Sequence, residues 1–234
     1  MNFRIFDSVA DLVQAAARDI VRRAASRTSF RIALSGGSTP EPLYALLGSA
    51  PLRDQLTPLE IDWIVGDERC VPIDDPASNA GMILRTLFAQ GIPERHHFLR
   101  FPTEEGDPER IAAGFERAWK ERRIERLDLA IQGMGEDGHT ASLFPGTSVL
   151  EVRDRIAAPV YVPRLDSWRV TLTLPVLEQS GAIMVLAAGA GKRAAIEQLR
   201  AGGTDFPIAR VTSAVEDTWW FTDRAAAERD VGTL

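Results

Sequence analysis

Residues 127–146 read LDLAIQGMGEDGHTASLFPG. The stretch opens with an apolar run, Leu127–Ile131, that is typical of a buried strand. Glycines, an aspartate and one of the three histidines of the chain follow directly after it. In open α/β sheets ligands bind beyond the carboxyl ends of the strands, glycine lets backbone approach a ligand closely, and histidine exchanges protons near neutral pH. The stretch therefore predicts an α/β fold with a ligand-binding loop over residues 133–146.

The rest of the chain alternates short apolar runs with helical patterns. The predicted strands are Asn2–Phe6, Phe30–Leu34, Ile61–Val65, Leu127–Ile131, Val170–Thr173 and Ile183–Ala187. The predicted helices are an amphipathic segment over residues 9–21, capped by Asp7 or Ser8, together with Asn79–Gln90 and Pro108–Ile124. This alternation predicts a Rossmann-like, mostly parallel sheet with helices on both faces. We expect residues 1–234 to form a single domain, and a smaller second lobe built from the later residues stays open.

Composition limits the function classes. The 234 residues are 45% hydrophobic and 26% charged, as in a globular protein. The net charge of −6 disfavours a general nucleic-acid binder but not a protein for a small anion. The single cysteine, Cys70, excludes an intrachain disulfide and a cysteine-cluster metal site. Neither a secretory signal nor an apolar run of the ~20 residues that span a bilayer is present. We expect a cytoplasmic protein without a membrane or nucleic-acid partner, and no obligate protein partner is evident.

A first candidate site is the segment Ser35-Gly36-Gly37-Ser38-Thr39-Pro40, directly after a predicted strand. Pro40 suits the first turn of a helix. Backbone amides at the glycines, the Ser38 and Thr39 hydroxyls and the helix dipole could together hold a phosphate. A tight turn capped by Ser38 or Thr39 would use the same residues, so both interpretations stay open.

Three charged residues, Asp67-Glu68-Arg69, end the strand Ile61–Val65. They could supply proton transfer and anion binding, since arginine suits bidentate contact with phosphate. A surface ion pair is the alternative. Cys70 has no base beside it in sequence, which favours a buried structural thiol over a nucleophile.

Two further cations lie near the ends of predicted strands. Arg169 opens the alternating segment that ends at Thr173, and Lys192 comes shortly after Ile183–Ala187. The Lys192 segment is not a P-loop, because Leu186 stands at the first glycine position and Arg193 at the magnesium-binding one. A lysine at a helix start opposes the helix dipole, which indicates a nearby anion. A solvated surface lysine is the alternative.

His139 is the candidate general base. Asp137 lies two residues before it and could orient the imidazole and stabilise its charged form. A histidine that only bonds its own loop is the alternative. His96 and His97 lack this setting and are predicted to be structural.

Together these segments resemble the 6-phosphogluconolactonase family. The matching pieces occur in the family's order: Leu34–Pro40, Gly66–Pro72 with Ser78-Asn79, Gly133–Gly146, Arg169–Thr173, and Gly189 with Lys192. The resemblance implies a Rossmann-like α/β sandwich shared with glucosamine-6-phosphate isomerases. It implies hydrolysis of 6-phospho-D-glucono-1,5-lactone to 6-phospho-D-gluconate, in the pentose phosphate pathway, without metal or organic cofactor.

The resemblance also implies roles for the site residues. His139 would be the general base, Asp137 would orient it, and Arg69 or backbone amides would stabilise the oxyanion. The implied substrate contacts are Gly36, Gly37, Ser38, Thr39, Asp67, Arg69, Gly135, Arg169 and Lys192. Many relatives carry a lysine- and proline-rich approach to the Arg-x-Thr strand, where this chain has Val162–Trp168. Arg164 would replace that lysine as a phosphate ligand.

Two other functions are possible for this set of motifs. A glucosamine-6-phosphate isomerase/deaminase typically has tyrosine after the aspartate–glutamate pair and an acid a few positions after the histidine. Arg69 and Phe144 stand there instead. A non-catalytic sugar-phosphate sensor normally carries an attached helix-turn-helix, for which the sequence shows no spare segment. Both alternatives are therefore disfavoured.

Overall fold

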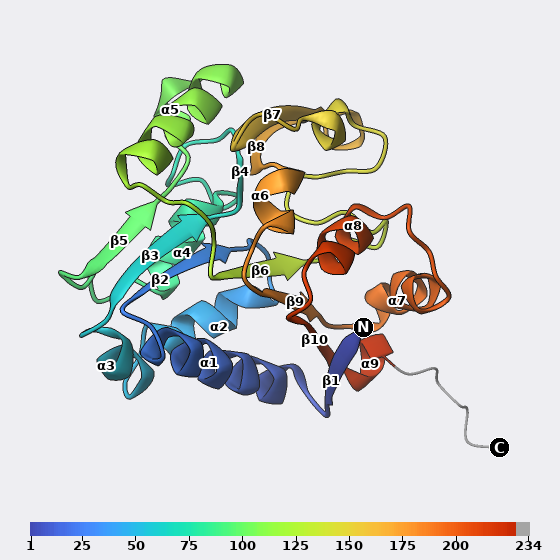
Figure 1. The fold of residues 1–234 in the computed structure, drawn as a ribbon, viewed down its shortest axis with the longest axis horizontal. Helices are drawn as coiled ribbons and strands as arrows, with labels where there is room; N and C mark the ends of the chain where they lie inside the picture. The colour runs from blue at the N-terminus through green and yellow to red at the C-terminus, as the bar shows by residue number, and fades with distance from the viewer. Residues whose placement is uncertain (228–234) are drawn as a thin grey trace.

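A seven-stranded parallel sheet forms the centre of the computed structural model, which describes residues 1–227 (Figure 1). From edge to edge its strands are β1 (Asn2–Phe6), β10 (Thr218–Asp223), β9 (Ile183–Ala187), β6 (Leu129–Gly133), β2 (Ser29–Leu34), β3 (Glu60–Val65) and β5 (His96–Leu99). Each neighbouring pair is parallel. The inner strands are buried almost throughout because helices cover both faces of such a sheet. The Rossmann-like prediction is confirmed.

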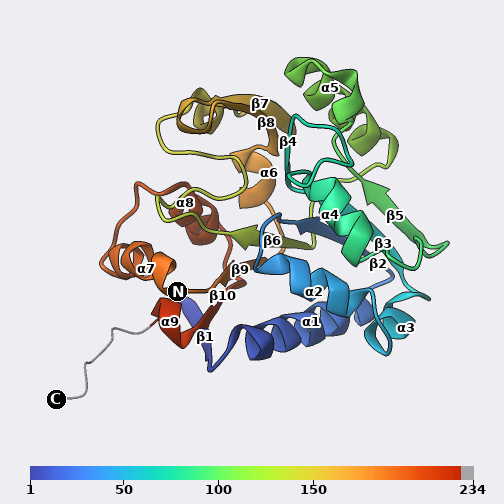
Figure 2. The same cartoon turned by 180° about the vertical axis from the view of Figure 1, so that it is seen from behind.

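Helices pack on the two faces of the sheet, as Figures 1 and 2 show. On one face lie α1 (Val9–Ala25), α2 (Pro40–Leu47) and α3 (Leu52–Leu56), and on the other α5 (Pro108–Glu121), α6 (Leu174–Glu178) and α8 (Pro207–Ala214). The remaining helices are α4 (Asn79–Thr86), α7 (Arg193–Arg200) and α9 (Arg224–Ala227). No helix within residues 1–227 is long and apolar enough to cross a membrane.

Local signals explain where the helices begin and end. Of the two predicted caps, Ser8 is the one that caps α1, by accepting a hydrogen bond from the Asp11 amide. Helix α4 ends at Thr86 instead of Gln90, and α5 ends at Glu121 instead of Ile124. Arg123 takes a left-handed backbone conformation with φ of 52°, which a helix cannot continue through.

A second, antiparallel sheet contains β4 (Asp67–Arg69), β8 (Ser167–Leu172) and β7 (Ala157–Val162), with β8 in the middle. It lies above one face of the main sheet beside α5 and α6 (Figure 1) and is the smaller lobe that the sequence left open. The assignment of Val170–Thr173 to the parallel sheet was wrong. Only a short turn, η3 (Pro163–Leu165), joins β7 to β8, and a parallel crossover needs a much longer connection. The single-domain interpretation stays a prediction.

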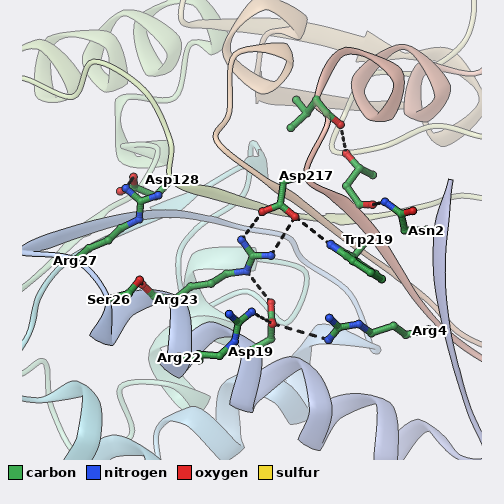
Figure 3. A network of polar contacts seen from close by, with 12 residues as sticks. Asn2, Arg4, Asp19, Arg22, Arg23, Ser26, Arg27, Asp128, Asp217 and Trp219 are labelled. Carbon is green, nitrogen blue, oxygen red and sulfur yellow. Dashed lines mark hydrogen bonds and ion pairs between the residues drawn. The ribbon is translucent and has the colours of Figure 1, made fainter.

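A network of ion pairs ties α1 to the amino ends of the strands (Figure 3). Asp19 is buried and accepts hydrogen bonds from Arg22 and Arg23. Arg23 also donates to Asp217, just before β10, at 2.8 Å. The Trp219 indole donates to the same carboxylate at 3.0 Å. Each of these charges is therefore neutralised by a partner within the protein.

Candidate active site

A cavity of about 280 Å³ opens at the opposite, carboxyl ends of β2, β6 and β9. Arg69 and Arg169 reach it from the small sheet. The predicted site residues that line it are Gly36, Gly37, Ser38, Thr39, Asp67, Arg69, Gly135, His139, Arg169 and Lys192. Asp137 and Arg164 are the predicted residues that do not line it. Segments far apart in the sequence thus meet where parallel α/β sheets bind ligands.

His139 and Asp137 form a hydrogen-bonded pair at the edge of this cavity. The Asp137 Oδ1 atom lies 2.5 Å from His139 Nδ1. The Phe144 ring stacks on the imidazole, with 4.1 Å between centroids. A Cβ at Gly135 would collide with both the imidazole and the carboxylate, so only glycine fits there. Because Nδ1 is occupied by Asp137, Nε2 is the nitrogen left for a ligand or water.

Burial and neighbouring charges set the protonation of this pair. Burial lowers the pKa of His139, and this effect outweighs the opposite influence of Asp137. Burial raises the pKa of Asp137, but the His139 hydrogen bond and charge, with Arg164, bring it below its usual value. A neutral imidazole beside an ionised carboxylate is the arrangement of a general base at neutral pH.

Arg69 and Arg169 stand opposite each other in the β4–β8 pair. The Nε atom of each is buried without a hydrogen-bond partner. Arg69 donates from Nη1 to the Ala77 carbonyl at 2.5 Å, and within residues 1–227 neither guanidinium has an ion-pair partner. Burial and then the neighbouring Arg69 lower the pKa of Arg169. Two adjacent cations with unsatisfied donors have the chemistry to bind an anion.

Glu68 is buried and makes contacts that stabilise the local structure. It is fully buried, and burial raises its pKa. Its carboxylate accepts hydrogen bonds from the backbone amides of Arg69, Asn79 and Ala80 and from the Ser78 hydroxyl. The surface ion pair considered for this segment is thus absent from the described structure, and Glu68 instead caps α4 and fixes the preceding loop.

Asp67 lines the cavity and is held by two residues that motif reasoning did not select. The Ser142 hydroxyl donates to Asp67 Oδ2 at 2.6 Å. The Asn79 side-chain amide donates to the Asp67 carbonyl at 2.7 Å. A Cβ at Gly36 would collide with this amide, which ties the glycine loop to α4. Asn79 stood in the matched Ser78-Asn79 pair and Ser142 in the His139 loop, but neither had been given a role.

The loop after β2 presents donors to the cavity. Thr39 is the N-cap of α2, yet its side chain makes no capping hydrogen bond. The Thr39 side chain therefore does not cap the turn, as the alternative interpretation required. Gly37 has φ of 109°, a conformation that favours glycine. Lys192 reaches the same cavity from η4 (Ala190–Lys192), at the start of α7.

Arg164 lies on the other side of the His139–Asp137 pair. Its Nη2 atom is 2.6 Å from Asp137 Oδ2, and its guanidinium lies 5.0 Å from the Phe144 ring centroid. These contacts put Arg164 beside the pair rather than among the side chains that line the cavity.

His96 and the cysteine have structural surroundings. His96 is buried, accepts a hydrogen bond from the Trp63 indole and bonds the Leu56 carbonyl, as expected for a structural residue. Burial raises the pKa of Cys70 to about 11, so its thiol stays protonated. Within residues 1–227, no group of three or more His, Cys, Asp or Glu side chains could hold a metal ion.

Known proteins resemble this chain over nearly its whole length. The 6-phosphogluconolactonase of a Synechocystis strain is 36% identical over 220 residues, 89% of this chain and 88% of that protein. The human 6-phosphogluconolactonase is 35% identical, over 95% of this chain and 91% of the relative. The solved 6-phosphogluconolactonase of Trypanosoma cruzi superposes with a TM-score of 0.85 at 26% identity, covering 99% of this chain and 97% of that one.

The fold is also that of a monomeric glucosamine-6-phosphate deaminase, with a TM-score of 0.79 at 23% identity over 97% of this chain and 98% of the other. At this identity the likeness concerns the fold alone. The predicted resemblance, and with it an enzyme of this type, is confirmed by the curated relatives. The family model for glucosamine-6-phosphate isomerases/6-phosphogluconolactonase matches residues 5–220. The chain therefore belongs to the glucosamine-6-phosphate isomerase/6-phosphogluconolactonase family.

Proposed function

We propose that this protein hydrolyses 6-phospho-D-glucono-1,5-lactone to 6-phospho-D-gluconate. One observation carries the proposal: the His139–Asp137 pair and the unpaired Arg69 and Arg169 meet at a single cavity. A lactone that carries a phosphate needs a base at one end and cations at the other. The names of the relatives point to the same reaction.

His139 acts as the general base. Its Nε2 takes a proton from water while the water oxygen attacks the lactone carbonyl carbon. The tetrahedral intermediate then collapses with cleavage of the bond to the ring oxygen, which takes up the proton from the imidazolium. Asp137 accepts the hydrogen bond from protonated Nδ1 throughout, with 2.5 Å between Nδ1 and Oδ1, and stabilises the imidazolium.

Arg69 and Arg169 hold the phosphate. A phosphate dianion would neutralise both guanidinium groups and satisfy their buried Nε donors. Gly37, Ser38 and Thr39 line the same cavity, and their backbone amide and hydroxyl groups would supply further donors. Lys192 and the amides of the glycine loops then remain for the oxyanion that forms at the carbonyl.

The proposed reaction uses no metal ion or organic cofactor. The base, the phosphate cations and the oxyanion donors are all groups of the chain. We expect a chelator to leave turnover unchanged. Turnover that is lost with the chelator and restored by a divalent ion would contradict this part of the proposal.

The deciding test is a lactonase assay of wild type and His139→Ala, corrected for spontaneous lactone opening. Loss of the general base should lower kcat by ~10²–10⁴-fold. Circular dichroism checks that the variant folds. Wild-type turnover in His139→Ala would refute His139 as the base, whereas an inactive wild-type protein would refute the lactonase itself.

Ring opening and deamination of glucosamine 6-phosphate is less well supported. Phe144 stacks on His139, on a loop where deaminases are expected to carry an acid. Release of ammonia from glucosamine 6-phosphate at a catalytic rate would favour that reaction instead.

A further inference from the structure

Arg164 reaches from the β7–β8 turn to the loop that carries His139. Its guanidinium Nη2 lies 2.6 Å from Asp137 Oδ2, and the other oxygen of that carboxylate, Oδ1, lies 2.5 Å from His139 Nδ1. Both carboxylate oxygens are therefore engaged. An ion pair and a hydrogen bond thus link the β7–β8 turn through Asp137 to the imidazole.

A second contact follows the same route. The Arg164 guanidinium packs over the Phe144 ring at 5.0 Å, and that ring stacks on the His139 imidazole at 4.1 Å. Arg164 thus touches both side chains that fix the imidazole. It does not line the cavity that Arg69, Arg169 and Lys192 line. These contacts do not suit a phosphate ligand.

We propose that Arg164 is a positioning residue that acts on His139 through Asp137 and Phe144. This inference rests on the proposed lactonase function. Arg164 keeps the carboxylate aimed at Nδ1, so that Nε2 is the proton-accepting nitrogen. Its positive charge also offsets that of Asp137, which otherwise favours the imidazolium form.

The charges around His139 support this role. The charged groups that face it or share its cavity are Asp137, Arg164, Asp67, Arg69, Arg169 and Lys192. Burial lowers the pKa of His139, Asp137 raises it, and Arg164 lowers it. Removing the charge of Arg164 should therefore raise the pKa of His139, and a larger fraction of the base would be protonated at neutral pH.

The kinetic test compares Arg164→Gln and Arg164→Lys with wild type. In Arg164→Gln the acid limb of the kcat/KM profile should move up by about half a pH unit or more. The same variant should lose about tenfold in kcat with KM nearly unchanged. Arg164→Lys keeps the charge, so the acid limb should lie at its wild-type pH and kcat should be close to the wild-type value. Arg153→Gln is the matched control, because Arg153 is also about half exposed and paired, to Glu178.

Three kinetic outcomes overturn the proposal. A raised KM in Arg164→Gln, with kcat and the acid limb as in wild type, would make Arg164 a phosphate ligand. An unchanged kcat, KM and acid limb would remove any role in the reaction. A comparable shift in Arg153→Gln would reduce the effect to general surface charge.

An NMR titration of the imidazole nitrogens separates this inference from the proposed function. The chain has three histidines, so His139→Asn identifies the His139 signal. We expect protonated Nδ1 in the neutral wild-type ring and a higher pKa in Arg164→Gln. If the wild type does not hydrolyse the lactone but the pKa rises, the proposed function fails and the link from Arg164 to His139 stands. An equal pKa in both proteins would refute the link.

Discussion

The arginines at the two ends of the parallel sheet differ in whether they have carboxylate partners. At the amino ends, Arg23 lies between Asp19 and Asp217, with hydrogen bonds of 2.7 and 2.8 Å (Figure 3). At the carboxyl ends, Arg69 and Arg169 lie side by side without a carboxylate partner within residues 1–227. The first arrangement stabilises the fold, and the second is tolerated because a ligand can supply the missing negative charge.

This difference distinguishes residues expected to contribute to stability from residues expected to contribute to substrate binding. Asp19 and Arg23 are satisfied before any ligand arrives, so their loss should affect stability and leave the cavity as it is. Arg69 and Arg169 have no carboxylate partner within residues 1–227, and in the proposed function a phosphate takes that place, so their loss should affect binding and leave stability as it is.

Arg169→Ala should lower kcat/KM for the lactone by about 10²–10³-fold, chiefly through KM, because one phosphate partner is lost. Its melting temperature should not fall, since the change removes a cation that Arg69 repels. Steady-state kinetics and thermal unfolding measure the two effects. A destabilised variant with normal KM would mean that Arg169 serves the fold.

The product, 6-phosphogluconate, should raise the free energy of unfolding of the wild type by about 2.7 kcal/mol at 100 times its Kd. Arg169→Ala should gain far less at the same concentration, and Asp19→Asn should gain as much as wild type. Thermal shift measurements test this. Equal stabilisation of Arg169→Ala and wild type would place the anion elsewhere.

Asp19→Asn should lower the free energy of unfolding by about 2 kcal/mol, because Arg23 and its neighbours lose a buried partner. Activity should stay at the wild-type level. Its control is Asp7→Asn, whose pair with Arg224 is exposed and should contribute less than about 0.5 kcal/mol. Urea unfolding of both variants measures the difference.

The same variant tests pH dependence at the paired end. Arg23 and Arg22 hold the pKa of Asp19 below its usual value despite burial. The stabilisation is therefore full above the unfolded pKa of about 3.9 and is lost as pH falls through the lower folded pKa. Wild type should lose stability in this range by more than Asp19→Asn does.

At the carboxyl ends of the strands we expect activity, rather than stability, to depend on pH. The pKa of His139 is lowered, so kcat/KM should rise with pH as the imidazole loses its proton. Its half-maximal point should lie below the ordinary histidine pKa of about 6.5. A half-maximal point clearly above pH 6.5 would contradict a lowered pKa for the base.

The sequence predicted the local features well because they depend on neighbours along the chain. The glycine loops after β2 and β6, the Ser8 cap and the amphipathic face of α1 are all local. Strand β7 was missed since Pro159 interrupts its pattern, yet β7 is an edge strand, where proline is tolerated. Strand β5 was missed because it is short and begins with two histidines.

Contacts between distant segments were not predictable in the same way. Ser142 and Asp67 are 75 residues apart, and nothing in either neighbourhood indicates their hydrogen bond. The role of Glu68 depends on amides of residues 79 and 80, which only the folded loop brings to it. The contact of Arg164 with Asp137 likewise exists only because the β7–β8 turn leans toward the His139 loop.

By itself, therefore, the sequence determined the α/β class, the glycine loops after β2 and β6 and the residue types of the candidate site, because periodicity, glycine and histidine act locally. Only the tertiary structure decided which charges find partners. Arg23 meets Asp19 and Asp217 at one end of the sheet, while Arg69 and Arg169 meet each other at the other end. Pairing is a matter of distance in space, and the packing of the two sheets sets that distance.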